Sequence, residues 1–398
     1  MGEAEEASDV FLFSHGWNND WAAAASQYGR FITSYLTLRR REWPRPGRDY
    51  RPLLAGVHWP STALVAPWER GPKIAGAVER SGSVIDEVTA LGESLGVKDR
   101  QRLYDLADRD RLDDVRARDL AELLAPLLAD EGQDELGRAG VSGADDLLGI
   151  WARLSRPPVS SSGGFIDEPT DQPVEETPFP APTVAGGLGW LDPRNAVRVA
   201  TVLLMKDRAG VVGSRGVADL LAALCRTQAR IHLIGHSYGA KVILSALCAP
   251  SSVPRPVDSV LLLQPAVSCY CFATKVAGDD HPGGYHAAVE RCVQPIVTTF
   301  SRKDVPLTSL FHWAVRRRSD LGEVRIAGVP SRYAALGGYG PQGREDETAV
   351  IQPVAPPERY AFGKPIVAIQ ADEMIGGHGD VTGEACAWAL LNQVMHDG

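Results

Sequence analysis

The chain has 398 residues, which suits one large α/β domain with insertions, or two domains. Apolar residues make up 44% and charged residues 23%, a composition that can bury a sizeable core. With 41 basic against 50 acidic residues the net charge is −9, which argues against a protein that wraps nucleic acid, because such binding depends on clustered Lys and Arg.

The N-terminal segment predicts two strands joined by a helix. Residues 1–10 are Glu-rich and lack the positive and apolar regions of a signal peptide. The apolar run Asp9–Ser14 predicts a buried strand that ends in a sharp turn at His15-Gly16. Residues 20–41 carry apolar side chains at helical spacing, and residues 51–58 predict a second strand.

Charge and proline content then change along the chain. Residues 81–156 contain 17 acidic and 10 basic residues with leucines at helical spacing, which predicts short amphipathic helices. Residues 157–193 contain eight prolines, six acidic residues and no basic one, the composition of a flexible linker. The net charges of these two segments are −7 and −6, so the rest of the chain has a net charge of +4. We therefore predict a core formed by 1–80 and 194–398, interrupted by an acidic helical insertion that acts as a lid or docking module, and by the linker.

The second half of the chain alternates strands with helices. Apolar runs predict four strands, at 230–235, 257–263, 295–300 and 365–370. Helices are expected around 197–204 and at 216–226, 240–248 and 383–395. This alternation indicates an α/β fold with a mostly parallel central sheet and helices on both faces.

The strongest functional signal is the G-x-S-x-G sequence from Gly235 to Gly239, with Ser237 at its centre. The pattern alone is weak, but an apolar strand leads into it and a helix-forming segment leads out. That setting is typical of a nucleophile elbow, in which a strained turn exposes the serine hydroxyl. The two glycines fit, because Cβ atoms there would collide with neighbouring backbone. The alternative is a serine in a glycine-rich loop without chemistry.

A nucleophilic serine needs a base and an acid that orients the base, and both follow the serine of such an elbow. Of nine histidines only His378 and His396 follow the last predicted strand, and His378 lies in a loop just past it. We therefore predict His378 as the base. Asp304 follows a predicted strand at the edge where ligand-facing loops gather, and is the predicted acid. Asp372 and Asp279 are alternatives.

The oxyanion formed during acyl transfer needs two N–H donors. The backbone N–H of Tyr238, the residue after the nucleophile, would supply one. The loop after the first strand would supply the other, most simply the N–H of Trp17. An ordinary glycine turn is the alternative for this loop.

These motifs together resemble the α/β-hydrolase superfamily, in its esterase- and lipase-like branch. They also resemble a bacterial subgroup with an H-G-aromatic-N-N loop and a W-P-S strand end, here His15–Asn19 and Trp59–Ser61. The resemblance covers about 1–70, 195–310 and 365–395. It implies a catalytic triad of Ser237, Asp304 and His378, and an oxyanion hole formed by Trp17 and Tyr238.

Two departures from that superfamily matter. The strands that usually open its sheet have no room before Val10. Some relatives carry an acid after the strand that follows the nucleophile helix, where this chain has Gln264. The absence of that rival acid favours Asp304.

We expect a metal-independent serine hydrolase without a cofactor, which cleaves a carboxylic ester through an acyl-enzyme. An amidase, peptidase or thioesterase would use the same groups, and a non-catalytic binding module on a hydrolase scaffold is an alternative. The expected substrate is a small-molecule or lipid ester, and a protein partner would bind the insertion and linker at 81–193. With sparse cysteines and no apolar run of the ~18 residues that span a membrane, we expect a cytoplasmic protein with no nucleic-acid partner and no integral membrane segment.

Overall fold

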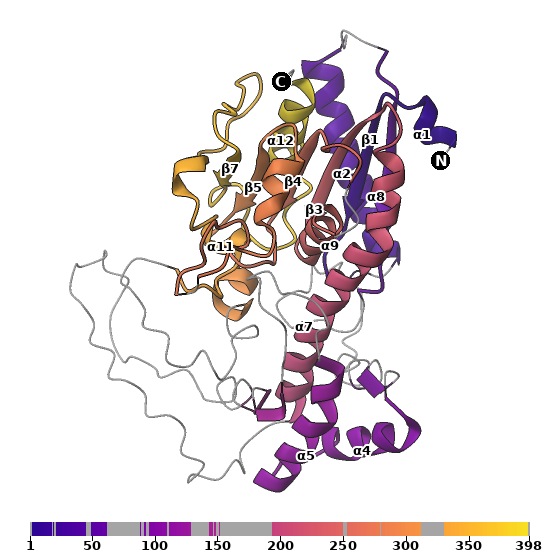
Figure 1. Ribbon diagram of the computed structural model, residues 1–398, viewed down its shortest axis with the longest axis vertical. Coiled ribbons are helices and arrows are strands. Elements are labelled where there is room, and N and C mark those ends of the chain that lie inside the picture. The colour runs from indigo at the N-terminus through magenta and orange to yellow at the C-terminus, as the bar shows by residue number, and fades with distance from the viewer. Residues whose placement is uncertain are drawn as a thin grey trace, which may run out of the picture.

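A parallel β-sheet organises the chain (Figure 1). The computed structural model describes residues 2–44, 49–61, 88–128, 143–151, 193–249, 253–311 and 330–396, except positions 18, 20, 89–90, 93–94, 110, 146, 149–150 and 279. Within these residues the sheet has seven strands in the order β2-β1-β3-β4-β5-β7-β6, and every neighbouring pair is parallel. The strands are β1 (Asp9–Ser14), β2 (Pro52–Val57), β3 (Arg230–His236), β4 (Ser259–Leu263), β5 (Ile296–Phe300), β6 (Thr348–Ile351) and β7 (Ile366–Gln370). The predicted α/β fold with a parallel central sheet is confirmed.

Helices connect the strands. The α-helices are α1 (Gly2–Glu6), α2 (Trp21–Glu42), α4 (Val97–Ala107), α5 (Asp114–Leu124), α7 (Pro193–Val211), α8 (Ala218–Leu224), α9 (Tyr238–Leu247), α11 (Leu336–Tyr339) and α12 (Glu384–Met395). Shorter helical turns are η1 (Ala125–Leu128), η2 (Val212–Val217), η3 (His286–Arg291), η4 (Pro306–Leu310) and η6 (Glu345–Glu347). The predictions missed α1 and the edge strand β6. Both are short, and β6 has no fully buried side chain, so neither produces a clear apolar pattern.

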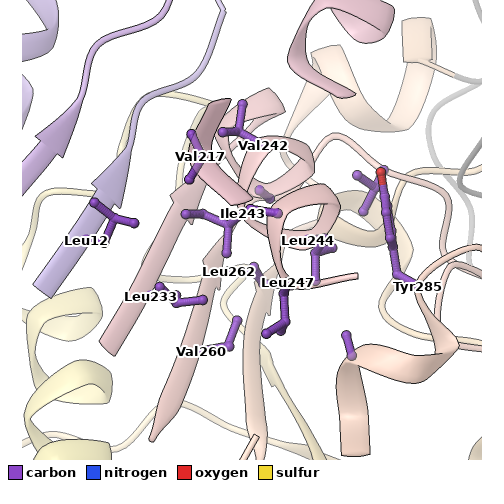
Figure 2. Close-up of a cluster of buried hydrophobic side chains, with 14 of the residues drawn as sticks. Leu12, Val217, Leu233, Val242, Ile243, Leu244, Leu247, Val260, Leu262 and Tyr285 are labelled. Carbon is purple, nitrogen blue, oxygen red and sulfur yellow. The ribbon is translucent and has the colours of Figure 1, made fainter. Parts of the chain in front are cut away.

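The two faces of the sheet carry separate hydrophobic cores. Because successive side chains of a strand point to opposite faces, β1 sends Val10 and Leu12 to one core and Phe11 and Phe13 to the other. The first core includes side chains of α8 and α9. Figure 2 shows side chains of α9 next to those of β3 and β4. The second core includes α2 and α12. Helices therefore cover both faces, as predicted.

One long helical rod links the sheet to the insertion. The predicted helices at 197–204 and 216–226 are parts of this rod, in which α7 continues through the π-helical turn η2 into α8. It passes close to α9 at Gly213, where an added Cβ would lie 2.3 Å from the Val242 carbonyl oxygen. α7 begins at Pro193, the residue predicted to end the linker, since proline suits the first turn of a helix.

The insertion contains helices, as its leucine spacing predicts. α4 and α5 form a third hydrophobic core together with Trp151 and with Ala196, Val197 and Ala200 from the start of α7 (Figure 1). The first half of α7 therefore packs with the insertion, although the sequence division at residue 194 assigns it to the central core. Of the predicted linker at 157–193, residues 157–192 lie outside the described residues.

Two further features concern the described chain as a whole. Among the described residues, no helix is long and apolar enough to cross a membrane. All six cysteines are free, and Cys225, Cys269, Cys271 and Cys386 are buried.

Candidate functional site

The candidate site lies where the strand order of the sheet reverses. From β1 the chain moves outward to β2, and it then returns to the other side of β1 to form β3, β4 and β5. The register pairs Ser14 at the end of β1 with Gly235 near the end of β3, so the loops after these strands start side by side and diverge. Ligands of open parallel sheets bind at such a switch point, at the carboxyl ends of the strands.

Ser237 occupies a strained turn between β3 and α9. Its φ of 55° and ψ of −125° cost on the order of 1–3 kcal/mol for a residue with a side chain. Three backbone hydrogen bonds hold the turn: the Ser237 N–H donates to Leu263 O (3.1 Å), and Ser237 O accepts from the N–H groups of Ala240 (3.1 Å) and Ala266 (3.2 Å). The strain is therefore offset by attachment to the end of β4 and the residues that follow.

The glycines on either side of the serine let the turn fit. A Cβ on Gly235 would lie 2.6 Å from the Cα of Ala240. A Cβ on Gly239 would lie 2.1 Å from the carbonyl oxygen of Ser14. Both distances are too short for real atoms, so the predicted collision with neighbouring backbone is confirmed.

Ser237, His378 and Asp304 form a continuous hydrogen-bonded chain. The Oγ of Ser237 lies 2.7 Å from Nε2 of His378, and Nδ1 of His378 lies 2.8 Å from Oδ2 of Asp304. A carboxylate only accepts, so the proton of a neutral His378 sits on Nδ1 and leaves Nε2 to accept from the serine hydroxyl. Ser237 and Asp304 are 4% and 0% exposed, so this chain is largely shielded from water.

Asp304 is held in its ionised form by several donors. Burial by itself raises the pKa of this carboxyl, but the charge of His378 and hydrogen bonds from His378, Gln264 and the Leu307 N–H outweigh it, so the pKa lies below its usual value. Gln264 donates through Nε2 to Oδ2 of Asp304 (3.0 Å) and to Gly337 O (3.1 Å). Gln264, which stands where some superfamily members carry an acidic residue, thus orients Asp304.

A second histidine fixes the loop that carries His378. His236 directly precedes Ser237 and lies buried, and burial lowers its pKa to about 3, so its ring is neutral. Its Nε2 lies 2.9 Å from the carbonyl oxygen of His378 and therefore donates to it. Its Nδ1 consequently accepts, from Nε2 of Gln27 on α2 at 3.1 Å. Ser301, just after β5, adds a hydrogen bond from its hydroxyl to Ile375 O in the same loop (3.0 Å).

The loop after β1 lies directly against the serine. A Cβ on Gly16 would lie 2.8 Å from the Cβ of Ser237, so only glycine fits there without displacement. The next residue, Trp17, has its ring 6.3 Å from the ring of Tyr238. The side chains of the two residues predicted to supply oxyanion donors therefore lie close to each other.

Side chains of the two sequence motifs brace this loop. His15 stacks on Trp59 with ring centroids 5.6 Å apart, and the Trp59 indole N–H donates to His15 O (2.9 Å). Ser61 accepts from the Asn19 N–H (3.2 Å) and donates to Asn19 O (3.0 Å). His15 and Asn19 of the first motif are thus hydrogen-bonded to Trp59 and Ser61 of the second.

The alternatives considered for the base and the acid lie apart from this chain of contacts. His396 caps the end of α12 and packs against Phe362. The Asp372 carboxylate accepts from the N–H of Arg302 (2.6 Å) and from Gln370 (2.7 Å). Asp279 lies outside the described residues.

Sequence reasoning missed the supporting side chains of the site. Gln27, His236 and Gln264 were given no role, because nothing in the chain marks which amide or imidazole faces the site. Their spacing carries no signal either, since Gln27 and His236 are 209 positions apart.

Among the described residues, no group of three or more His, Cys, Asp or Glu side chains is placed to hold a metal ion. In comparisons with known proteins, no family model, no curated protein and no solved structure matches the chain.

Proposed function

We propose that this chain is a serine hydrolase of the α/β-hydrolase superfamily that cleaves carboxylic esters through an acyl-enzyme. The observation that carries the proposal is the Ser237–His378–Asp304 chain, with contacts of 2.7 and 2.8 Å at the switch point of a parallel sheet. The order Ser, Asp, His along the sequence and the strand–turn–helix around the serine also support it.

In the proposed mechanism each group has a step. His378 Nε2 takes the hydroxyl proton of Ser237 as Oγ attacks the ester carbon, and a tetrahedral intermediate forms. The carbon–oxygen bond to the alcohol then breaks, and His378 returns its proton to the leaving oxygen. Water, deprotonated by His378, then attacks the acyl carbon. The bond from that carbon to Oγ breaks, and His378 returns the proton to Oγ as the acid leaves. Asp304 stays ionised and stabilises the imidazolium, which agrees with its lowered pKa.

The negative oxygen of the tetrahedral intermediate needs donors on the side of Ser237 where the β1 loop lies. The backbone N–H groups of Trp17 and Tyr238 are the proposed donors. Tyr238 opens α9, so the helix dipole also favours negative charge at this point. Removal of one such donor in other serine hydrolases costs about 10²–10³-fold in rate.

The insertion is proposed as a lid or docking module for a protein partner. Its support is the rod of α7, η2 and α8, which shares one core with α4 and α5 and contacts the nucleophile helix α9 at Gly213. The helix that packs against the insertion therefore continues into the turn that lies against the nucleophile helix.

A fluorophosphonate probe and a series of p-nitrophenyl esters test the proposed function. We expect the probe to label the wild type and to leave Ser237→Ala unlabelled. Asp304→Asn should lose about 10³–10⁴-fold in ester hydrolysis, because the His378 tautomer is no longer fixed. The matched control Asp372→Asn changes a carboxylate that contacts Arg302 and Gln370 instead, and should keep wild-type activity.

The outcomes separate the candidate functions. Equal labelling of wild type and Ser237→Ala would refute the nucleophile. No hydrolysis of any ester, with no labelling, would favour the binding module. Preference for an amide or thioester substrate, with the same dependence on Ser237, would keep the mechanism and change the substrate class.

A further inference from the structure

The peptide group between Gly16 and Trp17, close to Ser237, has its carbonyl oxygen held by two side chains. The carbonyl oxygen of Gly16 lies 2.8 Å from Nδ1 of His15 and accepts a hydrogen bond from Nδ2 of Asn19 at 3.2 Å. Asn19 Nδ2 also lies 3.3 Å from Trp17 O. Two donors on one carbonyl in so short a loop hold that peptide plane in a single orientation.

The tautomer of His15 follows from its other contacts. Its Nε2 accepts from the backbone N–H of Trp59 at 3.3 Å, so that nitrogen carries no proton. Burial lowers the pKa of His15 to about 4, so the ring is neutral and holds its single proton on Nδ1. Nδ1 therefore donates to the Gly16 carbonyl.

The carbonyl of Gly16 and the N–H of Trp17 belong to the same peptide group. The only cis peptide bond in the described residues is Pro356-Pro357, so this peptide is trans, and its C=O and N–H point in opposite directions. Fixing the carbonyl against His15 and Asn19 therefore fixes the N–H on the opposite side. A hydrogen bond accepted by a carbonyl also polarises its peptide and strengthens the N–H as a donor.

We propose that His15 and Asn19 are positioning residues that orient and polarise the Gly16–Trp17 peptide, so that the Trp17 N–H is ready to bind the oxyanion. The proposal rests on the proposed serine hydrolase function. Neither side chain touches the reacting atoms, and both act through the backbone of the β1 loop. Ser61 and Trp59 hold these two residues in turn, through the contacts to Asn19 and His15 described above.

Matched pairs of variants test the role of each donor. His15→Asn keeps an N–H at the position of Nδ1, whereas His15→Leu has a similar shape without the donor. Asn19→Asp keeps the shape of Asn19 and replaces the donor with a carboxylate oxygen that faces the Gly16 carbonyl. Asn19 is partly exposed, so Asn19→Asp provides a test if His15→Leu fails to fold.

Two measurements distinguish positioning of the oxyanion donor from a general effect on the fold. The first is kcat and KM for a p-nitrophenyl ester over a pH series. The second is the affinity for a trifluoromethyl ketone, whose carbonyl carbon bonds to the Oγ of Ser237 while the proton passes to His378 and the ketone oxygen becomes an oxyanion. A group that stabilises only the oxyanion affects kcat and ketone affinity together.

We expect His15→Leu and Asn19→Asp to lower kcat about 10–100-fold, somewhat less than removal of an oxyanion donor. The ketone affinity should fall by the same factor, with KM within about 2-fold and the pH profile unmoved. His15→Asn should stay within about 3-fold of wild type, about the effect of a small change in hydrogen-bond geometry.

Several results would overturn this role. One is wild-type kcat in both His15→Leu and Asn19→Asp. Another is a fall in kcat without a fall in ketone affinity. A third is a shift in the acid limb of the pH profile of kcat, which would mean that these residues act through His378. If wild type is active and Ser237→Ala is not, such results refute only the positioning role. An inactive, unlabelled wild type refutes the proposed function itself.

Discussion

Burial of the neutral His236 ring makes the fold sensitive to acid. The folded pKa is about 3, against about 6.5 for an exposed histidine. At a pH above the pKa of the unfolded chain, neither the folded nor the unfolded chain binds this proton. The free energy of unfolding therefore has its full value. As the pH falls below that pKa, only the unfolded chain takes up the proton, and stability is lost until the pH reaches the folded pKa.

The size of the effect follows from the interval between the two pKa values. A pH of 5.0 is about 1.5 units below the pKa of this histidine in the unfolded chain. That interval corresponds to about 2 kcal/mol of lost stability. His15, whose folded pKa is about 4, adds a loss of similar size in the same interval. Because stabilities of whole proteins are only about 5–15 kcal/mol, the sum is measurable.

Urea unfolding at pH 7.5 and pH 5.0 tests this prediction with the variant His236→Gln. At pH 7.5 the variant should be less stable than wild type, because the contacts to Gln27 and His378 are disturbed. Between the two pH values it should lose about 2 kcal/mol less than wild type, since it has no proton to take up at this position. The matched control His281→Gln removes a partly exposed histidine near Pro282 and should keep the wild-type pH dependence. Equal losses in wild type and His236→Gln would refute the reasoning.

Two further substitutions probe the turn and the acid. Gly239→Ala places a Cβ 2.1 Å from Ser14 O, so we expect a loss of about 1–3 kcal/mol or more in the free energy of unfolding, whereas Gly363→Ala, which has no atom within 4 Å, should be neutral. A neutral Gly239→Ala would contradict the packing of the elbow. Gln264→Leu removes a donor to Asp304 and should cost about 1.5–3 kcal/mol at pH 7. Because the lowered pKa of Asp304 stabilises the fold only while the carboxyl is ionised, this difference should shrink as the pH falls through that pKa. A deficit that stays constant while the carboxyl becomes protonated would argue against it.

The features of this protein that depend on local chemistry could be predicted from its amino-acid sequence alone. Apolar runs predicted β1, β3, β4, β5 and β7, because a strand buried on both faces must be apolar throughout. Gly235 and Gly239 marked the turn around Ser237, because a backbone that approaches so closely leaves no room for a Cβ. Asp304 and His378 could be selected because the carboxyl ends of parallel strands meet at one edge, so that position after a strand predicts position in space.

The side chains that support those three residues could be found only in the folded chain. Gln264 reaches Asp304 across 40 positions, and Gln27 reaches His236 across 209. Hydrogen bonds of this kind need only two polar groups at the right distance, so they produce no periodicity and no motif in the chain. The same reason separates two histidines. His236 ends the buried strand β3, and the fold desolvates its ring. His378 lies in the loop after β7, and the fold places its ring between a serine and a carboxylate.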